Sequence, residues 1–226
     1  MAARAKSDID VRFGELSGYV EELAEKFVNR FLPADPATSP DAYALDVRAY
    51  CMLAHAAFEE FIEAVASEVV ERVANGWLLH RTVSDVLLTL LSWHGSTLKI
   101  DENEGSVETK NFDYLRPLIN AAKAAFSNEI HNNHGISIIH LRNLLTPIAI
   151  DIKQDAGLLN SLKQLAEGRG LYAHHGKVKS VLAPEYAKNY VEDCLSLCDD
   201  IKTKAIAKLV AAKPKVRKTK KKAKLP

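Results

Sequence analysis

The sequence predicts an all-α protein, a compact bundle of about seven helices, and three observations support this. Apolar residues recur at helical spacing through most of the 226 residues. No strand-like alternation, internal repeat or glycine-rich phosphate loop interrupts them. Hydrophobic residues make up 47% of the chain, enough to bury a substantial core. We therefore expect one helical domain over 1–212, with its helices from residue 7 onward, and a disordered Lys/Arg-rich tail over 213–226.

The N-terminal half begins with a clear helix signal. Ser7 and Asp10 have the spacing of a capping box, and apolar residues after them recur every three or four positions as far as Phe27. Prolines and small polar residues mark 32–40 as a loop. The helices expected in this half span 7–31, 40–74 and 82–93, and Asn75-Gly76 ends the second.

The C-terminal half carries periodic segments that are separated by polar stretches. The segment 95–110 is polar and contains glycine, so it reads as a loop before a helix capped by Asn111. Pro117 falls in the second turn of that helix, where a kink is expected. The remaining helices are expected over 111–129, 137–145, 156–167 and 184–212, with a turn at 131–135.

Charge is distributed unevenly. The formal net charge is +1, from 30 Lys and Arg against 29 Asp and Glu, but eleven of the basic residues and none of the acidic ones lie from Lys202 onward. The other 19 basic residues leave residues 1–201 at about −10. A basic tail on an acidic body indicates contact with polyanions such as nucleic acid, through phosphate neutralisation that reads no sequence.

Several functional classes are disfavoured by composition. No apolar run approaches the ~20 residues of a membrane span, and the N-terminus lacks the apolar stretch of a signal peptide, so a cytoplasmic protein without membrane contact is expected. Cys51, Cys194 and Cys198 cannot form a disulfide framework, and no further soft ligands stand near them. We interpret them as free thiols and expect neither a metal nor a cofactor.

The strongest chemical signal is the segment Arg169-Gly170-Leu171-Tyr172-Ala173-His174. It pairs a permanent cation suited to phosphate with the one side chain that titrates near neutral pH. Those two groups are what is needed to move a proton beside a phosphodiester and to hold its charge.

The spacing resembles the Arg-x(4–6)-His motif of the HEPN superfamily of helical ribonucleases. Two further runs are similar to the RiboL-PSP-HEPN type: Tyr50 to Phe61, which looks like its early acidic helix, and Asn133 to Ile148, which precedes the Arg/His segment. Together the resemblance covers most of residues 45–210. One departure is Gly170, where the family commonly has a polar neighbour.

The resemblance implies a metal-independent endoribonuclease that works as a homodimer, of the kind that serves as a toxin or phage-defence effector. Arg169 would brace the phosphate and His174 would be the general acid or base. His175 and Tyr172 would assist, and Glu59 or Glu60 would orient Arg169 from the second helix. RNA is the implied substrate, and an antitoxin or another partner protein remains open.

Helix geometry makes a further prediction about this motif. Five residues along a straight α-helix turn the side chains about 140° apart, so the two groups would diverge. Gly168 and Gly170 flank the arginine and weaken a helix. We therefore expect the helix to end or kink here, unless two copies of the motif face each other across a dimer cleft.

Simpler interpretations stand beside the catalytic one. Arg169 could pair with an acid such as Glu167 while His174 caps a helix C-terminus. The domain could equally be a catalytically inactive HEPN-type module that binds RNA, a nucleotide or a partner protein, or a purely structural helical protein. The acidic residues of 59–71 are expected to form a solvated face, His131 and His134 to be structural, and the core to include Phe13, Phe27, Phe58, Phe61 and Phe126.

Overall fold

The computed structural model describes residues 7–95, 107–175 and 182–211, and within these it describes no side chain of 107–113 or 169–175. Seven α-helices and no strand occur in the described ranges, which confirms the all-α prediction. The helices are α1 (Asp8–Phe27), α2 (Ala44–His80), α3 (Asp85–His94), α4 (Val107–His131), α5 (Ile138–Leu145), α6 (Ala156–His175) and α7 (Pro184–Ala211). Short 3₁₀ turns lie at Asn29–Phe31, Pro40–Ala42 and Thr146–Ile148.

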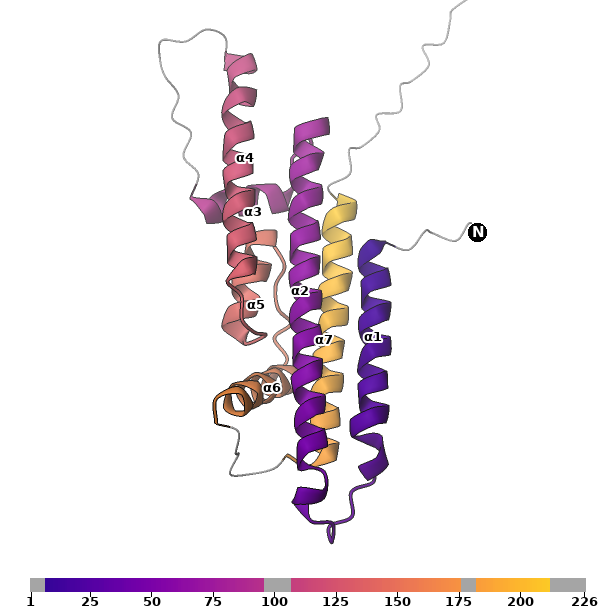
Figure 1. Ribbon diagram of the computed structural model, residues 1–226. Coiled ribbons are helices and arrows are strands. Elements are labelled where there is room, and N and C mark those ends of the chain that lie inside the picture. Colours follow the sequence, from indigo (N-terminus) through magenta and orange to yellow (C-terminus); the bar gives the residue numbers. More distant parts are fainter. Residues whose placement is uncertain (1–6, 96–106, 176–181, 212–226) are drawn as a thin grey trace, which may run out of the picture.

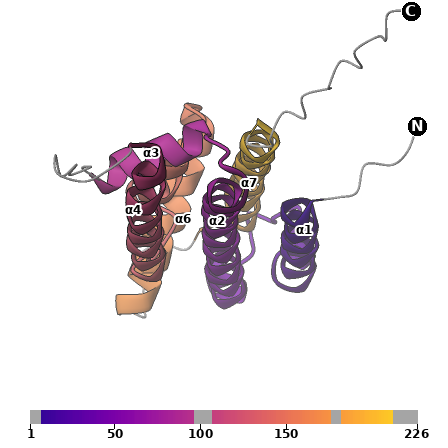
Figure 2. The same cartoon turned by 90° about the horizontal axis from the view of Figure 1, so that it is seen from above.

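Helix α2 is the axis of the molecule. Helices α1 and α7 run beside it on one side, and α4 runs beside it on the other (Figures 1 and 2). Helix α3 crosses near the C-terminal end of α2, whereas α6 crosses the bundle at the N-terminal half of α2 and packs against α2, α5 and α7. Helices α3 to α6 thus build a second layer over one flank of α2.

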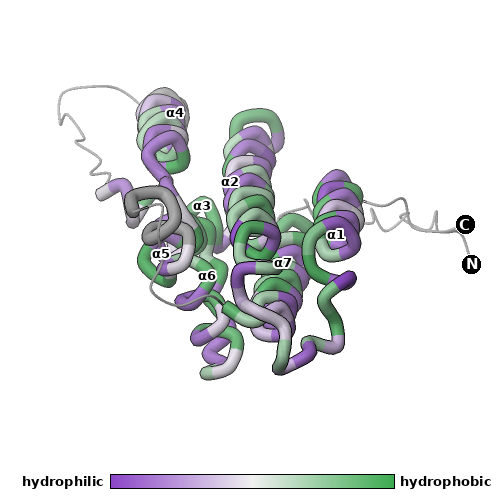
Figure 3. Tube along the Cα trace, turned by 60° about the horizontal axis from the view of Figure 1, so that its bottom comes forward, coloured by the Kyte–Doolittle hydropathy of each residue, from purple (hydrophilic) through white to green (hydrophobic). Residues whose placement is uncertain are grey.

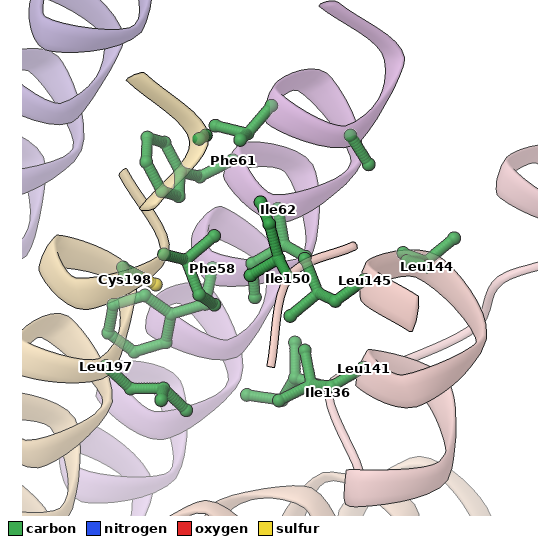
Figure 4. Packing of buried hydrophobic residues seen from close by; sticks show 14 of the residues in the cluster. Phe58, Phe61, Ile62, Ile136, Leu141, Leu144, Leu145, Ile150, Leu197 and Cys198 are labelled. Atoms are coloured by element: carbon green, nitrogen blue, oxygen red, sulfur yellow. The ribbon is translucent and has the colours of Figure 1, made fainter. Parts of the chain in front are cut away.

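The core follows α2 along its whole length. Figure 4 shows Phe58 and Ile62 of α2 between α7, which contributes Leu197 and Cys198, and the α5 region, which contributes Leu145. Hydrophobic and hydrophilic residues alternate along the helices, as Figure 3 shows, so each can bury one stripe and expose another. The phenylalanines behave as predicted: Phe58, Phe61 and Phe126 are buried, and Phe13 and Phe27 pack against the core.

The start of α1 confirms the predicted capping box. The Ser7 hydroxyl accepts a hydrogen bond from the Asp10 amide at 3.1 Å, and the Asp10 carboxylate accepts from the Ser7 amide at 3.1 Å. Two backbone donors that a helix N-terminus leaves unsatisfied are therefore paired. A 3₁₀ turn completes the predicted stretch to residue 31.

Helix α2 does not end where the sequence predicted. It continues through Asn75 and Gly76 to His80, and Arg81 closes it in the left-handed conformation (φ 57°). Trp77 is only 6% exposed, so burial of a large aromatic side chain beyond the glycine outweighs the ~1 kcal/mol that glycine costs in a helix. Arg81 also donates from Nη1 to the carbonyl of Leu78 at 2.7 Å, which satisfies the helix end.

Three helix starts differ from the prediction. Helix α2 begins at Ala44 rather than 40, because Pro40–Ala42 forms a separate 3₁₀ turn. Helix α3 begins at Asp85 rather than 82, because the Ser84 hydroxyl accepts from the Leu87 amide at 3.2 Å and so caps it. Helix α4 begins at Val107, so Asn111 lies inside it rather than at its cap, and Pro117 lies beyond its second turn.

Helix α6 does not end at residue 167 either. Its backbone is helical from Ala156 to His175 and includes the whole segment from Arg169 to His174. The expected termination at the flanking glycines is therefore wrong. Leu158, Leu162 and Leu165 anchor the earlier turns in the core, and elongation of an anchored helix needs one further hydrogen bond per residue rather than a new nucleus.

The predicted tail over 213–226 lies outside the described residues, as does the last residue expected in the final helix, 212. Most of the loop expected over 95–110 lies outside them as well. In the part of the chain that is described, no helix combines the length and hydropathy that crossing a bilayer requires.

Candidate functional site

Part of α2 places polar side chains directly beside the core. His55, Glu59 and Glu63 follow one another at intervals of four residues, so they share that face. The His55 side chain is 2% exposed and that of Glu59 is 18% exposed. Nδ1 of His55 lies 3.7 Å from Oε2 of Glu59, close enough for an ion pair when the imidazole is protonated. A histidine–carboxylate pair thus sits at the edge of the core.

The connection between α4 and α5 lies over this face. The Asn133 amide group donates to Oε1 of Glu63 at 2.7 Å and to the carbonyl of Gly135 at 3.2 Å, which ties the loop to α2. Gly135 then passes between two histidines. A Cβ at this position would lie 3.1 Å from Nδ1 of His140 and 3.7 Å from Cε1 of His55. Glycine is favoured here because a side chain would press on the His140 ring.

His140 belongs to the first turn of α5. Its Nδ1 lies 3.2 Å from the hydroxyl of Ser137, the residue that caps α5. The ring is partly exposed, unlike that of His55. The two histidines therefore flank the same glycine, one from the core and one from the surface.

Helix α6 carries the Arg/His segment in its C-terminal turns. It crosses the N-terminal half of α2, which carries His55 and Glu59 (Figure 1), and it also packs against α5. The side chains of Arg169, Tyr172, His174 and His175 lie outside those described. In an unbroken helix, positions 169 and 174 are about 140° apart around the axis. Convergence by helix termination is therefore ruled out, and pairing across two copies remains a prediction.

The two glutamates predicted to assist lie on different sides of α2. Glu59 shares the polar face with His55. Glu60 is exposed and lines a groove of about 380 Å³ between α1 and α2, together with Arg12, Glu15 and Tyr19. Adjacent residues on a helix are 100° apart around its axis, so the side chains of Glu59 and Glu60 leave α2 in different directions.

The acidic stretch of α2 is less solvated than predicted. Glu63 is held by Asn133, and the side chain of Glu68 is 15% exposed beside Arg72. Glu71 lies 2.7 Å from the ammonium of Lys123 on α4. Glu167, the acid that a structural role would pair with Arg169, has Oε1 3.8 Å from Nζ of Lys163.

The histidines of the α4–α5 connection and the three cysteines show no arrangement for chemistry in the described part of the chain. His131 and His134 are exposed, and among the described residues no three His, Cys, Asp or Glu side chains are arranged to hold a metal ion. The three cysteines are free and buried. Burial raises the pKa of Cys51 and of Cys194 to about 12, and it raises that of Cys198 well above its usual value. These thiols stay protonated and unreactive at neutral pH.

Sequence reasoning missed His55, His140 and the loop that joins them. The i, i+4 spacing of His55 and Glu59 was visible within the run Tyr50 to Phe61. However, the same spacing is common on exposed helix faces, and only the tertiary structure shows that His55 is buried. Gly135 carried no signal without knowledge of the two rings beside it.

Comparison with known families gives one match. The model of the RiboL-PSP-HEPN family matches residues 15–207, a range that includes α2, the α4–α5 loop and the Arg/His segment. Neither the curated proteins nor the solved structures contain a significant match. Since the match covers most of the sequence, this chain belongs to the RiboL-PSP-HEPN family.

Proposed function

We propose that this protein is a metal-independent endoribonuclease whose catalytic residues are Arg169 and His174. Membership of a HEPN family supports a general role in RNA binding or cleavage. The observation that carries the proposal is the Arg/His segment itself, which lies in the C-terminal turns of α6 and within the range that the family model matches. It combines a permanent cation with a side chain that titrates near neutral pH.

The chemistry needs only groups of the protein and the substrate. The ribose 2′-hydroxyl attacks the adjacent phosphorus, the new O–P bond forms, and the bond from phosphorus to the 5′-oxygen breaks. His174 takes the 2′-hydroxyl proton or delivers a proton to the 5′-oxygen, and the assisting His175 makes the other transfer; such acid–base catalysis contributes typically ~10²–10⁴-fold. Arg169 stabilises the charge on the phosphorane oxygens. The products are a 2′,3′-cyclic phosphate and a 5′-hydroxyl.

Supporting roles follow from the placement of the glutamates. Of the two we assign the orientation of Arg169 to Glu59, because Glu60 lines the groove toward α1. Tyr172 and His175, which belong to the same segment of α6, serve as assisting groups that contact the nucleotide.

We further propose that the active form is a homodimer. Since α6 is unbroken, Arg169 of one copy and His174 of another provide the convergence that a single helix does not. The basic tail adds salt-sensitive affinity for RNA and other polyanions. A toxin or phage-defence role, with an antitoxin as partner, is consistent with such an activity.

The test uses purified full-length protein and a labelled RNA oligonucleotide in excess EDTA. Wild type should produce 2′,3′-cyclic phosphate ends, and a matched oligonucleotide with 2′-deoxyribose should not be cut. His174→Ala should lose at least 100-fold in rate while keeping the helical circular dichroism signal. Undiminished cleavage by His174→Ala would contradict the proposal. The matched control is His134→Ala, on the exposed loop, which should cleave at the wild-type rate.

A catalytically inactive binding module is the second candidate, and two observations favour it. Gly170 stands where the family commonly has a polar residue, and the helix continues through the motif to His175 instead of ending before it. In this case the domain retains RNA, a nucleotide or a partner protein without cleaving RNA. Salt-sensitive RNA retention with intact RNA recovered in the assay above would establish it.

A further inference from the structure

Helix α1 carries a stripe of exposed side chains along its length. Steps of three and four residues keep the stripe within about 80° around the helix axis, since each residue turns 100°. The core side chains of α1, such as Leu16 and Leu23, leave the helix in another direction, toward α2 and α7. The residues of this α1 stripe are Asp8, Arg12, Glu15, Tyr19, Glu22 and Lys26, and all are exposed.

The α1 stripe borders a groove. Arg12, Glu15 and Tyr19 line the groove of about 380 Å³ between α1 and α2. Its floor includes the buried side chain of Phe61, and Leu53 on its rim is 39% exposed. An apolar floor with polar edges is the form of groove that receives a helix from a partner.

The charges beside this groove are not neutralised within the described part of the chain. Asp8, at the first turn, contacts Arg72 of α2. Over the described residues, however, the side chains of Arg12, Glu15 and Glu22 form no ion pair or hydrogen bond with one another or with α2. Single exposed charges are ordinary on a helix, so the informative feature is the order in which these follow one another.

The order of the α1 stripe is complementary to its own reverse. If a second α1 lies antiparallel to the first, with a two-fold axis at the level of residue 17, residues equally far from that level face each other. Every position of the stripe then meets an opposite charge or a hydrogen-bonding partner. The facing residues are Asp8 and Lys26, Arg12 and Glu22, and Glu15 and Tyr19.

We propose that α1 is an interface between two copies of this chain, in which the α1 helices pack antiparallel and each lies along the groove between α1 and α2 of the other copy. Two α1–α2 pairs then form a four-helix bundle. The occupant is a second copy because the stripe matches itself at both signs of charge. The basic tail of the chain would attract Glu15 and Glu22 but would repel Arg12, which lies between α1 and α2 in the same groove.

This interface is separate from the pairing across α6 in the proposed function. Helices α1 and α6 lie on opposite flanks of α2 (Figures 1 and 2), so contact through α1 does not bring two α6 helices together. The inference therefore does not rest on ribonuclease activity. A protein that uses both contacts assembles beyond a dimer.

Charge reversal tests the interface in the full chain, with sedimentation equilibrium as the measurement. Arg12→Glu and Glu22→Arg each place like charges together twice across the two-fold axis, so each should weaken association at least about tenfold. At a concentration where wild type is associated, the particle mass should then halve. The double variant restores opposite charges and should recover the wild-type mass. Glu21→Arg is the matched control, since it lies 100° from Glu22, outside the stripe.

Three outcomes would overturn the inference. They are a wild type that is monomeric at every concentration, a folded Arg12→Glu that keeps the wild-type mass, and a double variant as weakly associated as the single ones. The second is also the result expected if the basic tail or another protein occupies the groove. None of them involves RNA, so the proposed function stands or fails by its own assay.

A disulfide test fixes the register without reversing a charge. Glu15→Cys and Tyr19→Cys are prepared separately, mixed and oxidised; the three native cysteines are buried and do not compete. The introduced thiols face each other only between the two variants, so the mixture should cross-link at least about fivefold more than either variant alone. Equal cross-linking of the mixture and the separate variants would contradict the antiparallel pairing.

Discussion

The two sides of α2 differ in kind. On the side of α1 and α7, side chains such as Phe58 and Val69 are buried in the apolar core, and polar contacts such as the Arg72–Asp8 ion pair are exposed. On the side of the α4–α5 loop, His55, Glu59 and Glu63 meet Asn133. One helix therefore supplies both the support of the fold and the most polar part of its interior.

Phe58 and His55 are both almost fully buried, but their burial has different consequences for the free energy of folding. A buried phenylalanine contributes free energy in proportion to the apolar area it removes from water. A buried histidine contributes little or costs free energy, and its value lies in the orientation it imposes. Substitutions on the packing side should therefore change stability, and substitutions on the polar side should change activity.

The largest effect is expected for Phe58→Ala on the packing side. Phe58 is 0% exposed, so its truncation should reduce the free energy of unfolding by about 3–5 kcal/mol. The measurement is urea denaturation followed by circular dichroism. Leu45→Ala is the control on the same helix, because Leu45 is 76% exposed and should change stability by less than about 0.5 kcal/mol. Equal losses for the two variants would contradict the assigned core.

Alkaline pH should destabilise the packing side next. The folded pKa of Cys51 and Cys194 is raised to about 12, above the ordinary 9.0, so between these values the unfolded chain loses protons that the folded chain keeps. The free energy of unfolding should be flat below about pH 8 and should then fall, by at most about 1.4 kcal/mol per pH unit for each thiol.

Urea titrations between pH 7 and 11 measure this slope. Cys51→Ala removes one titrating group, so its stability should fall less steeply with pH even if it is lower at neutral pH. A wild-type free energy that stays constant up to pH 11 would show that the thiols are accessible to water. Slow reaction with a thiol reagent at pH 8 provides an independent check.

The smallest expected change in stability distinguishes the two sides most directly. Ser7→Ala removes the cap of α1 and Asn133→Ala removes the contact to Glu63, and each should cost about 1 kcal/mol. Only Asn133→Ala should also slow RNA cleavage, because it releases the loop beside His55. Equal cleavage rates for the two variants would argue that the loop has no part in the site.

Several elements follow from local sequence alone. The capping box at Ser7 and Asp10, the Ser137 start of α5 and the burial of Phe58 and Phe126 rest on interactions within a few residues or on apolar periodicity. Membership of a HEPN family was also visible from three sequence segments that follow one another in the family's order. The family match over residues 15–207 confirms it.

Apart from the start of α3, which the local Ser84 cap sets, the main errors occur where distant contacts outweigh local preference. Gly76 and the glycines beside Arg169 carry weak signals to end a helix, yet α2 and α6 continue, since Trp77 and the leucines of α6 are buried by other helices. A glycine costs about 1 kcal/mol in a helix, and burial of one large side chain exceeds that. A short stretch of sequence cannot show which side chains other helices will bury, so it cannot show which of the two free energies is larger.

The sequence by itself determined the helical class, the helices whose ends are capped locally and the Arg169/His174 segment, since these depend on residues that are neighbours along the chain. Only the tertiary structure decided that His55 is buried against Glu59, that Gly135 lies between two histidines and that Glu60 faces α1. The physical reason is that these contacts join segments up to 80 residues apart along the chain, and their chemistry exists only once the helices have packed.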